Sequence, residues 1–550
     1  MQRSIRLPLW LIAVFLLSGA FAFKVALTDL VREDAAHAAR LFDLSFSDAQ
    51  LDSTLGILDE QREMYRSLRK NSFPNHALPP ALVFDPRPAD WKTTAQVPVF
   101  QTDNYLSVKL PASRDELAFY SIGQLARLLR TRRITSLELT EFFLARLKKY
   151  DPQLHCVVTY TEELARSQAK KADAEIAAGK YRGLLHGIPY GLKDMFFTKG
   201  YPTTFGTPPY REQRVEEDAA VVQKLQEAGA VLLAKLSLGE LAMDDVWFGG
   251  QTRCPWDTSR GSSGSSAGPG AAVSAGLVPF AIGSETWGSI VSPSTVNGVT
   301  GLRPTFGRVS RYGGMALSWS MDKVGPLCRI AEDCAIVLRA IAGADARDAA
   351  STDAPLAYRN RRNLTGVRIG FLKNEMEKDS VHRSIYAEAM KTLEKLGATL
   401  IPVAFPEHKG LATIISAESA AAFDELTRSH RDDAMVQQGK NNWPNFFRAA
   451  RFIPAVEYIQ ANRARYDLIQ KTADVMKTVD VVLCPPFGDN LLTTNLTGHP
   501  SVTVPAGFDN PTTPATVVFT GQLYDEGRLL GVAQAFQSAT AYHKKHPPGF

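Results

Sequence analysis

Short apolar runs that alternate with helical patterns restrict the fold of this 550-residue chain more than any other feature of its sequence. Helical patterns cover residues 162–178, 219–228 and 382–396, and apolar strand candidates cover residues 230–233, 367–372, 399–403 and 480–483. Each apolar run has the length of a buried strand and is short for a buried helix. Alternating helices and buried strands are typical of α/β proteins. The sequence therefore predicts an α/β fold built around a mixed sheet.

The distribution of charge excludes one class of partner. Lysine and arginine number 62 against 57 acidic residues, which gives a net charge of +5, and no block of the sequence concentrates the basic excess. Proteins that bind nucleic acids gather such residues on one face or along one helix. We therefore expect no nucleic-acid partner.

The cysteines show neither a metal site nor a disulfide framework. Their number is odd, and they are scattered without the paired spacings of zinc sites or redox motifs, at positions 156, 254, 328, 334 and 484. Cys328 and Cys334 could pair, but we favour the alternative that both are buried thiols. We expect no metal and no cofactor.

The N-terminus carries the pattern of an export signal. Arg3 and Arg6 precede an uncharged run over residues 7–23, which contains the small-x-small sequence Ala20-Phe21-Ala22. The run is slightly shorter than a typical membrane-spanning helix. Residues 1–24 are therefore expected to be a cleaved signal peptide or, alternatively, a membrane anchor through residues 7–23. Both alternatives place the protein in the periplasm or outside the cell.

Residues 25–114 are expected to form a helix followed by a proline-rich arm. Ser47 and Gln50 have the spacing of a capping box, and apolar residues then recur at helical spacing up to Arg69-Lys70. Seven prolines lie between residues 71 and 115, where they disfavour regular helix and predict an extended connector. We place a domain boundary near residue 115, with one large domain over residues 115–550.

A glycine- and serine-rich stretch over residues 260–270 has three alternative interpretations. A flexible linker is disfavoured, because the stretch leads directly into the small residues 271–277, which are typical of a closely packed helix. A phosphate-binding loop is disfavoured, because the Lys-Ser/Thr pair that contacts the phosphates is absent. The third interpretation is a serine nucleophile.

One form of that nucleophile is the α/β-hydrolase elbow. Residues 264–268 match its G-x-S-x-G pattern with Ser266 as nucleophile, and Asp489 and His499 would complete a triad. The elbow requires a buried strand directly upstream. Residues 251–261 are polar and contain a proline, so they cannot form such a strand, and we disfavour the elbow.

The chain resembles the amidase signature family over roughly residues 115–547. The matching segments are Gly187–Asp194, Cys254–Asp257, Gly283–Ile290 and Gly298–Ser310. The resemblance implies the amidase signature fold, in which a central mixed β-sheet is covered by helices on both faces. It also implies hydrolysis of an amide bond.

The family uses a Ser-Ser-Lys triad, which the resemblance carries over to Lys193, Ser265 and Ser289. Ser262 and Ser263 are alternatives for the middle serine, but counting back from Ser289 without a gap selects Ser265. The resemblance also implies a cis peptide bond between Gly264 and Ser265.

This triad requires a neutral lysine, because an ammonium group cannot accept a proton. Residues 187–192 are apolar and predict a buried strand that ends at Lys193, where burial would lower the lysine pKa. Without the resemblance, an exposed Lys193 paired with Asp194 would be the default interpretation. In the expected mechanism, Lys193 takes a proton through Ser265 from Ser289, and Ser289 attacks the amide carbonyl.

The resemblance also implies the residues that surround the substrate. Backbone N–H groups of Thr286, Trp287, Gly288 and Ser289 would form the oxyanion hole. Candidate substrate contacts are Met243, Trp247, Phe248 and Ser266. The chain departs from the family pattern at Trp287, where a small residue is usual, and at Val291-Ser292, where many members have an arginine. Both departures favour a more apolar pocket, and Trp287 could equally be a core residue.

The expected function is that of an exported amidase that acts on a small-molecule amide. Alternatives are the amidase-type component of a glutamine-dependent amidotransferase, an esterase or carbamate hydrolase, and a catalytically silent exported binding protein. An exported chain would not meet tRNA or the other components of an amidotransferase. The sequence leaves the substrate and the oligomeric state open.

Overall fold

The computed structural model describes residues 30–71, 73–76, 78–92 and 99–550. Contacts divide the described chain into two compact units, one that ends at Phe73 and one over Pro74–Phe550. The predicted export signal at residues 1–24 lies outside the described residues. No helix in the described ranges is long and apolar enough to cross a membrane.

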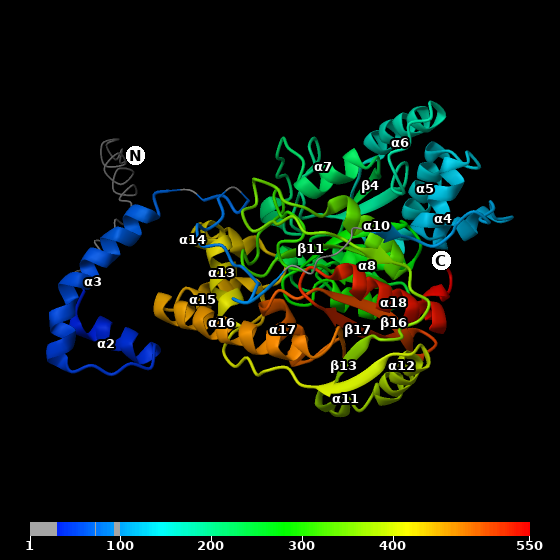
Figure 1. Ribbon diagram of the computed structural model, residues 1–550. Helices are drawn as coiled ribbons and strands as arrows, with labels where there is room; N and C mark the ends of the chain where they lie inside the picture. The colour runs from blue at the N-terminus through cyan, green and yellow to red at the C-terminus, as the bar shows by residue number, and fades with distance from the viewer. Residues whose placement is uncertain (1–29, 72, 77, 93–98) are drawn as a thin grey trace, which may run out of the picture. The chain divides into compact units, whose positions relative to one another are not determined.

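The described residues of the first unit form two helices, α2 (Arg32–Leu41) and α3 (Asp48–Leu68) (Figure 1). The predicted capping box starts α3, since Ser47 Oγ accepts a hydrogen bond from the backbone of Gln50 and the Gln50 side chain accepts one from the Ser47 backbone at 2.8 Å. These two bonds satisfy N–H groups that a helix start otherwise leaves unpaired. The predicted helix is confirmed.

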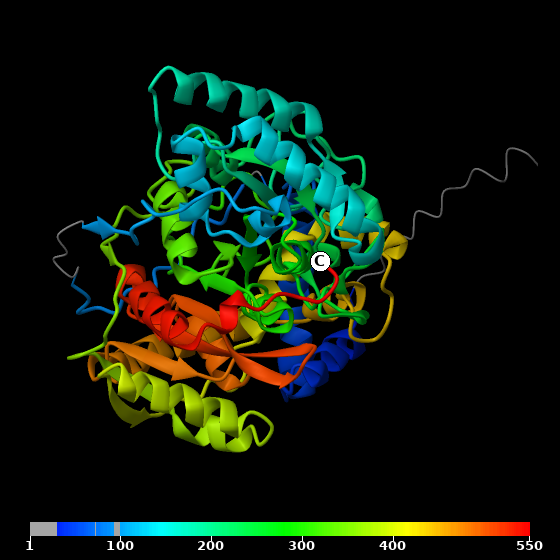
Figure 2. The same cartoon turned by 90° about the vertical axis from the view of Figure 1, so that its right-hand side faces the viewer.

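The second unit is built on one sheet of eleven strands (Figures 1 and 2). In spatial order these are β14 (Thr399–Val403), β13 (Arg368–Leu372), β15 (Val481–Cys484), β17 (Thr513–Gly521), β16 (Ser501–Asn510), β10 (Thr300–Arg303), β11 (Lys323–Cys328), β9 (Phe280–Glu285), β3 (Pro189–Lys193), β4 (Val231–Leu236) and β2 (Val157–Tyr160). Parallel pairs occur around β13 and β3, and the other pairs are antiparallel. The predicted mixed sheet and its predicted strands are confirmed.

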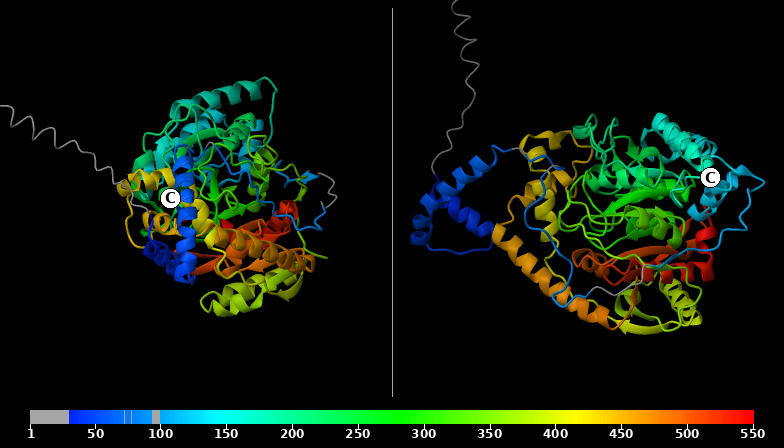
Figure 3. Two further views of the ribbon diagram at one scale, coloured as in Figure 1. Left: turned by 90° about the vertical axis from the view of Figure 1, so that its left-hand side faces the viewer. Right: turned by 45° about the horizontal axis from the view of Figure 1, so that its top comes forward.

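Helices flank this sheet, with α5 and α6 against the β4 end and α12 against the β14 end (Figure 2). The helices of the unit are α4 (Ile122–Arg130), α5 (Ser136–Leu154), α6 (Glu162–Ala177), α7 (Ala220–Glu227), α8 (Ala267–Ser274), α9 (Val291–Asn297), α10 (Ala331–Ile341), α11 (Lys373–Lys378), α12 (Arg383–Lys395), α13 (Thr413–Ala422), α14 (Asp424–Arg428), α15 (Trp443–Ala450), α16 (Ala455–Lys477), α17 (Asp489–Leu496) and α18 (Glu526–Thr540). The long helix α16 runs along the outside of the unit (Figure 3). The predicted α/β fold is therefore correct.

The glycine- and serine-rich stretch leads into a buried helix, as the small residues after it predict. Helix α8 starts earlier than expected, directly after Ser266, and every residue in it is buried. A Cβ atom at Gly268 would lie 2.6 Å from the backbone nitrogen of Ser237, so a larger residue would not fit here. Upstream, β7 (Arg253–Cys254) and β8 (Asp257–Gly261) form a separate two-stranded ladder outside the central sheet.

The proline-rich arm belongs to the second unit by its contacts, so that the division at residue 73 falls before the boundary expected near residue 115. The side chain of Asn75 donates to the carbonyls of Ala316 and Ala422 and accepts from the Ala316 backbone N–H, over distances of 2.8 to 3.1 Å. Further along, β1 (Phe100–Gln101) pairs in parallel with β12 (Tyr358–Arg359). The arm is thus hydrogen-bonded to the rest of the second unit at separate points.

Candidate active site

Lys193 lies at the end of β3 and is completely buried. Its Nζ atom is 2.8 Å from Ser265 Oγ, 3.1 Å from Ser266 Oγ and 2.9 Å from Ser284 Oγ. The alternative of an exposed lysine paired with Asp194 is wrong, because the Asp194 carboxylate forms a buried ion pair with Lys235 at 2.7 Å. Among the described residues, Lys193 therefore has three hydroxyl neighbours and no carboxylate partner.

The surroundings of Lys193 favour its neutral form. Burial lowers its pKa to about 7, because the ammonium form loses its hydration, while the more distant carboxylates of Asp322 and Glu285 oppose the shift only in part. A lysine with this pKa is substantially deprotonated at neutral pH. Such an amine can accept a proton from a neighbouring hydroxyl.

Ser265 lies within the glycine- and serine-rich stretch, directly before α8. The Gly264–Ser265 peptide bond is cis, as the resemblance implies. The backbone N–H of Ser266 donates to the carbonyl of Ser289 at 3.1 Å, which ties the serine-rich stretch to the segment between β9 and α9. The structure thus brings Lys193, Ser265 and Ser289 into one region.

Ser289 is more accessible than Ser265, Ser266 and Ser284. Its exposed fraction is 9%, against 1% for Ser265. Its hydroxyl forms no hydrogen bond with any described residue, and none joins it to Ser265 Oγ. Catalytic hydrogen bonds are often long before substrate binds. In this structure the hydrogen bond between Lys193 and Ser265 is formed, whereas a hydrogen bond between the Ser265 and Ser289 hydroxyls is not.

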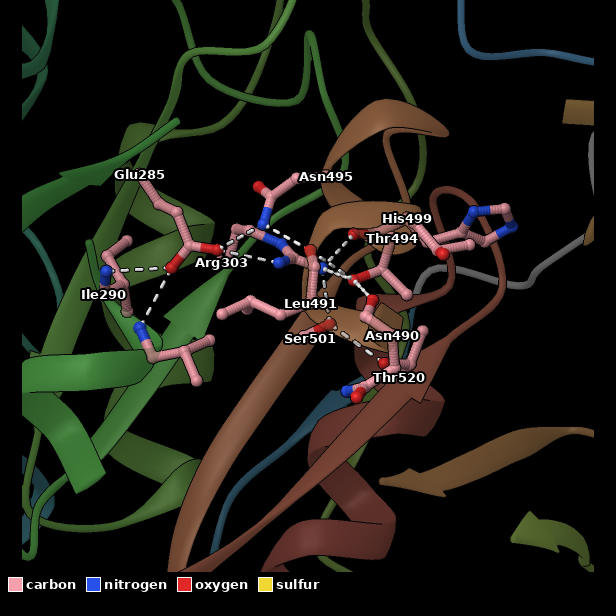
Figure 4. A network of polar contacts seen from close by, with 12 residues as sticks. Glu285, Ile290, Arg303, Asn490, Leu491, Thr494, Asn495, His499, Ser501 and Thr520 are labelled. Carbon is pink, nitrogen blue, oxygen red and sulfur yellow. Dashed lines mark hydrogen bonds and ion pairs between the residues drawn. The ribbon is translucent and has the colours of Figure 1, made fainter. Parts of the chain in front are cut away.

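A buried ion pair holds the segment that follows Ser289 (Figure 4). Glu285 accepts hydrogen bonds from the backbone N–H groups of Ile290 at 2.8 Å and Val291 at 2.9 Å, and its other oxygen lies 2.7 Å from Arg303 Nη1. Asn495 donates to the same oxygen as Arg303. Burial alone would raise the pKa of Glu285, but Arg303 and these donors lower it to about 2. A fixed carboxylate therefore holds the backbone next to Ser289.

Sequence reasoning named neither Ser284 nor Glu285 nor Arg303, although all three lie within the segments that resemble the family. Their residue types alone give no signal, because serines and paired charges occur throughout the sequence. Arg303 supplies a cation to Glu285 from β10, which is separated from β9 by β11 in the sheet.

The aromatic candidates for substrate contact differ in exposure. Trp247 is buried, and its indole N–H donates to the carbonyl of His155 at 3.2 Å, which gives this side chain a packing role. Phe248 is half-buried beneath the guanidinium of Arg211, and Met243 is half-buried. Trp287 has 44% of its surface exposed, so it is not a core residue.

The elbow alternative fails in the structure. His499 is buried, its Nδ1 lies 2.8 Å from the hydroxyl of Thr497, and burial lowers its pKa to about 3. The Ser266 hydroxyl instead contacts Lys193 and the Ser284 backbone. Asp489 is the first residue of α17 and makes no hydrogen bond with His499. Within the described chain, Ser266 therefore has no histidine base.

No group of three or more His, Cys, Asp or Glu side chains in the described part of the chain could hold a metal ion. All five cysteines are buried free thiols, including Cys328 and Cys334.

The chain resembles known amidases in both sequence and structure. The family model Amidase matches residues 138–530. A glutamyl-tRNA(Gln) amidotransferase component of Ectopseudomonas mendocina is 35% identical over 487 residues, which cover 78% of this chain and 99% of the relative. The solved peptide amidase of Stenotrophomonas maltophilia is 30% identical, with a TM-score of 0.71, and the match covers 78% of this chain and 98% of that one. The chain therefore belongs to the amidase signature family, and it is an amidase, a hydrolase of carbon–nitrogen amide bonds.

Proposed function

We propose that the chain is an exported, stand-alone amidase that hydrolyses a small-molecule amide through an acyl-enzyme on Ser289. The observation that carries the catalytic part of this proposal is the buried Lys193, which lies 2.8 Å from Ser265 Oγ and has no carboxylate partner among the described residues. Export rests on the sequence of residues 1–24 alone.

In this proposal, neutral Lys193 takes the proton of Ser265 while Ser265 takes that of Ser289, and Ser289 Oγ forms a bond to the amide carbonyl carbon. Lys193 becomes an ammonium ion in this step. It then returns the proton through Ser265 to the substrate nitrogen as the carbon–nitrogen bond breaks. A water molecule releases the acyl group by the same route, which restores Ser289.

The oxyanion would lie against the backbone of residues 286–289. The N–H groups of Trp287, Gly288 and Ser289 form no hydrogen bond with any described residue, so they are free to donate. Gly288 has a φ of +92°, a conformation that favours glycine. The N–H groups of Ile290 and Val291 are already bound to Glu285. Only the first part of the segment is available to a substrate oxygen.

The purified chain, tested by itself, separates this proposal from its alternatives. We expect it to hydrolyse amides without other protein components or tRNA, and a fluorophosphonate to label Ser289. A glutamine-dependent amidotransferase component is the alternative favoured by the sequence match to such a protein, and it predicts activity on glutamine that needs the other components. Absence of both hydrolysis and labelling would support a silent binding protein.

Activity should increase with pH around neutrality. Only the deprotonated Lys193 can start the reaction, and its pKa is lowered to about 7. We expect kcat/KM to fall about tenfold for each pH unit below 7 and to level off above it. A rate profile on a neutral amide between pH 5 and pH 9 checks this. A profile that is flat from pH 5 upward would contradict a lysine base.

The two buried serines Ser265 and Ser262 provide a matched pair of variants. Ser265→Ala removes the hydroxyl next to Lys193 and should lower kcat by about 1,000-fold or more. Ser262→Ala removes a hydroxyl that bonds only to backbone carbonyls, those of Ser263 and Ala267 at 3.2 Å. We expect this control to keep kcat within about threefold. Equal losses in the two variants would show that Ser265 has no special role.

A further inference from the structure

Lys323, the first residue of β11, is a buried lysine that the proposed mechanism does not use. Only 2% of its surface is exposed, and its Nζ atom has no hydrogen-bond partner among the described residues. Lys193, by contrast, contacts three hydroxyls. Burying a polar group without a partner costs free energy, so buried amines are normally hydrogen-bonded. Lys323 is thus a donor for which the described chain supplies no acceptor.

Lys323 lines a cavity of about 80 Å³. Ser265 and Ser289 do not line this cavity, so it is separate from the reacting atoms of the proposed mechanism. Its other walls include the loop over residues 311–316, the side chains of Met195 and Phe196, and Asn75, His76 and Pro79 of the proline-rich arm.

The charges around Lys323 leave its ammonium form without a counter-ion. Burial and the cation of Arg303 lower the pKa of Lys323 well below its usual value, and the Arg465 cation acts in the same direction. The carboxylates of Glu285 and Asp322 oppose the shift. These two cations and two carboxylates cancel in number. A charged Lys323 would therefore add one unbalanced positive charge to the interior, and one negative charge from a ligand would balance it.

The other charged side chains of the lining already have partners. Arg311 pairs with Asp348 at 2.7 Å. Arg347 pairs with Asp345 at 2.9 Å. The carboxylate of Asp322 accepts three hydrogen bonds of 2.5 to 3.0 Å, from a threonine hydroxyl and two backbone N–H groups. Of the lysine, arginine and aspartate side chains that line the cavity in the described chain, Lys323 alone lacks a partner.

The volume limits the size of a ligand. An apolar cavity that binds benzene has a volume of about 150 Å³, so this cavity is roughly half as large. It has room for acetate or a carboxylate of similar size, and an aromatic carboxylate would not fit without movement of the wall.

We infer that this cavity is a binding site for a small carboxylate, which forms an ion pair with the Nζ atom of Lys323. The amine takes up one proton from the solvent as the carboxylate binds, so the net charge of the interior stays the same. No covalent bond of the ligand changes. The site is distinct from the nucleophile and does not depend on the proposed function.

Calorimetric titration of the purified full chain with sodium acetate, at constant ionic strength, tests the site. Lys323 is neutral above pH 7 in the free protein and charged in the complex, so the apparent Kd should rise about tenfold for each pH unit between pH 7 and pH 9. Titrations in buffers with different ionisation enthalpies should report one proton taken up per acetate. His76 also lines the cavity, but burial lowers its pKa, so it is not the expected site of the proton.

Lys323→Met removes the amine and keeps a side chain of similar length. We expect it to weaken acetate binding by at least about 30-fold and to abolish the proton uptake. The fold should survive, because the substitution leaves no hydrogen-bond partner behind, and thermal unfolding checks this. Arg347→Gln is the matched control, since Arg347 lines the same cavity but has its own carboxylate partner. It should keep the acetate Kd within about threefold.

Three results would overturn the inference. The first is an unaltered protein that shows no saturable acetate binding. The second is a folded Lys323→Met protein that binds acetate as tightly as the unaltered one, or an Arg347→Gln protein that loses as much affinity as Lys323→Met. The third is benzoate binding as tight as that of acetate, which would exclude a site of this size. None of these results bears on amide hydrolysis or on Ser289 labelling, so the proposed function would stand.

Discussion

Replacing Lys193 by methionine is expected to lower kcat for amide hydrolysis by about four orders of magnitude. Methionine has a similar length but cannot accept a proton, so Ser265 and Ser289 keep their protons. Binding of the substrate does not need the amine, and KM should change little. The measurement is the rate of hydrolysis of a primary amide, together with the rate at which a fluorophosphonate labels Ser289.

The fold should survive this substitution. A completely buried amine is replaced by an apolar side chain, which removes the cost of its dehydration, and no carboxylate loses a partner. Lys224→Met is the matched control, since Lys224 is a half-buried lysine whose Nζ donates to the Ala342 carbonyl at 2.8 Å, away from the site. We expect the control to keep full activity. A Lys193→Met enzyme with more than about a tenth of the original rate would exclude lysine as the base.

The strands and helices of this protein could be predicted from local patterns, whereas their spatial order could not. The apolar run at residues 367–372 has the length and composition of a buried strand, and β13 forms there. Its neighbours in the sheet are β14 and β15, and β15 lies more than a hundred residues further along the chain. Such pairing depends on how distant surfaces fit, which a local pattern does not record.

The same limit applies to the site. Lys193 and Ser265 were found through segments that resemble a family, and a buried strand before Lys193 explains why its pKa can fall. The resemblance indicates Trp247 as a substrate contact, but the side chain is buried and its indole N–H donates to the His155 carbonyl. Asn75 was expected in a connector, and its contact with Ala316 spans 241 residues of sequence. These outcomes depend on side-chain direction, which spacing alone does not determine.

Replacing Arg303 is expected to have a large effect on stability, because the ion pair of Glu285 and Arg303 holds the backbone that follows Ser289. Arg303→Met leaves Glu285 buried without its cation, and breaking a buried pair in this way costs about 3 to 5 kcal/mol. Three further bonds of Arg303 are also lost, to the Thr494 and Ser501 hydroxyls and to the His499 carbonyl. We expect a large fall in the free energy of unfolding, measured by denaturant titration.

A double variant separates the charge from the position of the backbone. In Glu285→Gln/Arg303→Met neither charge remains, so much of the lost stability should return, while the bonds from Ile290 and Val291 meet a weaker acceptor. The segment with the proposed oxyanion donors would then be less firmly held, and kcat should fall by about 100-fold with little change in KM. Arg303→Lys keeps the cation and should restore more of kcat than Arg303→Met does. If the double variant regains both stability and kcat, the pair contributes only to folding, and Glu285 does not position the backbone beside Ser289.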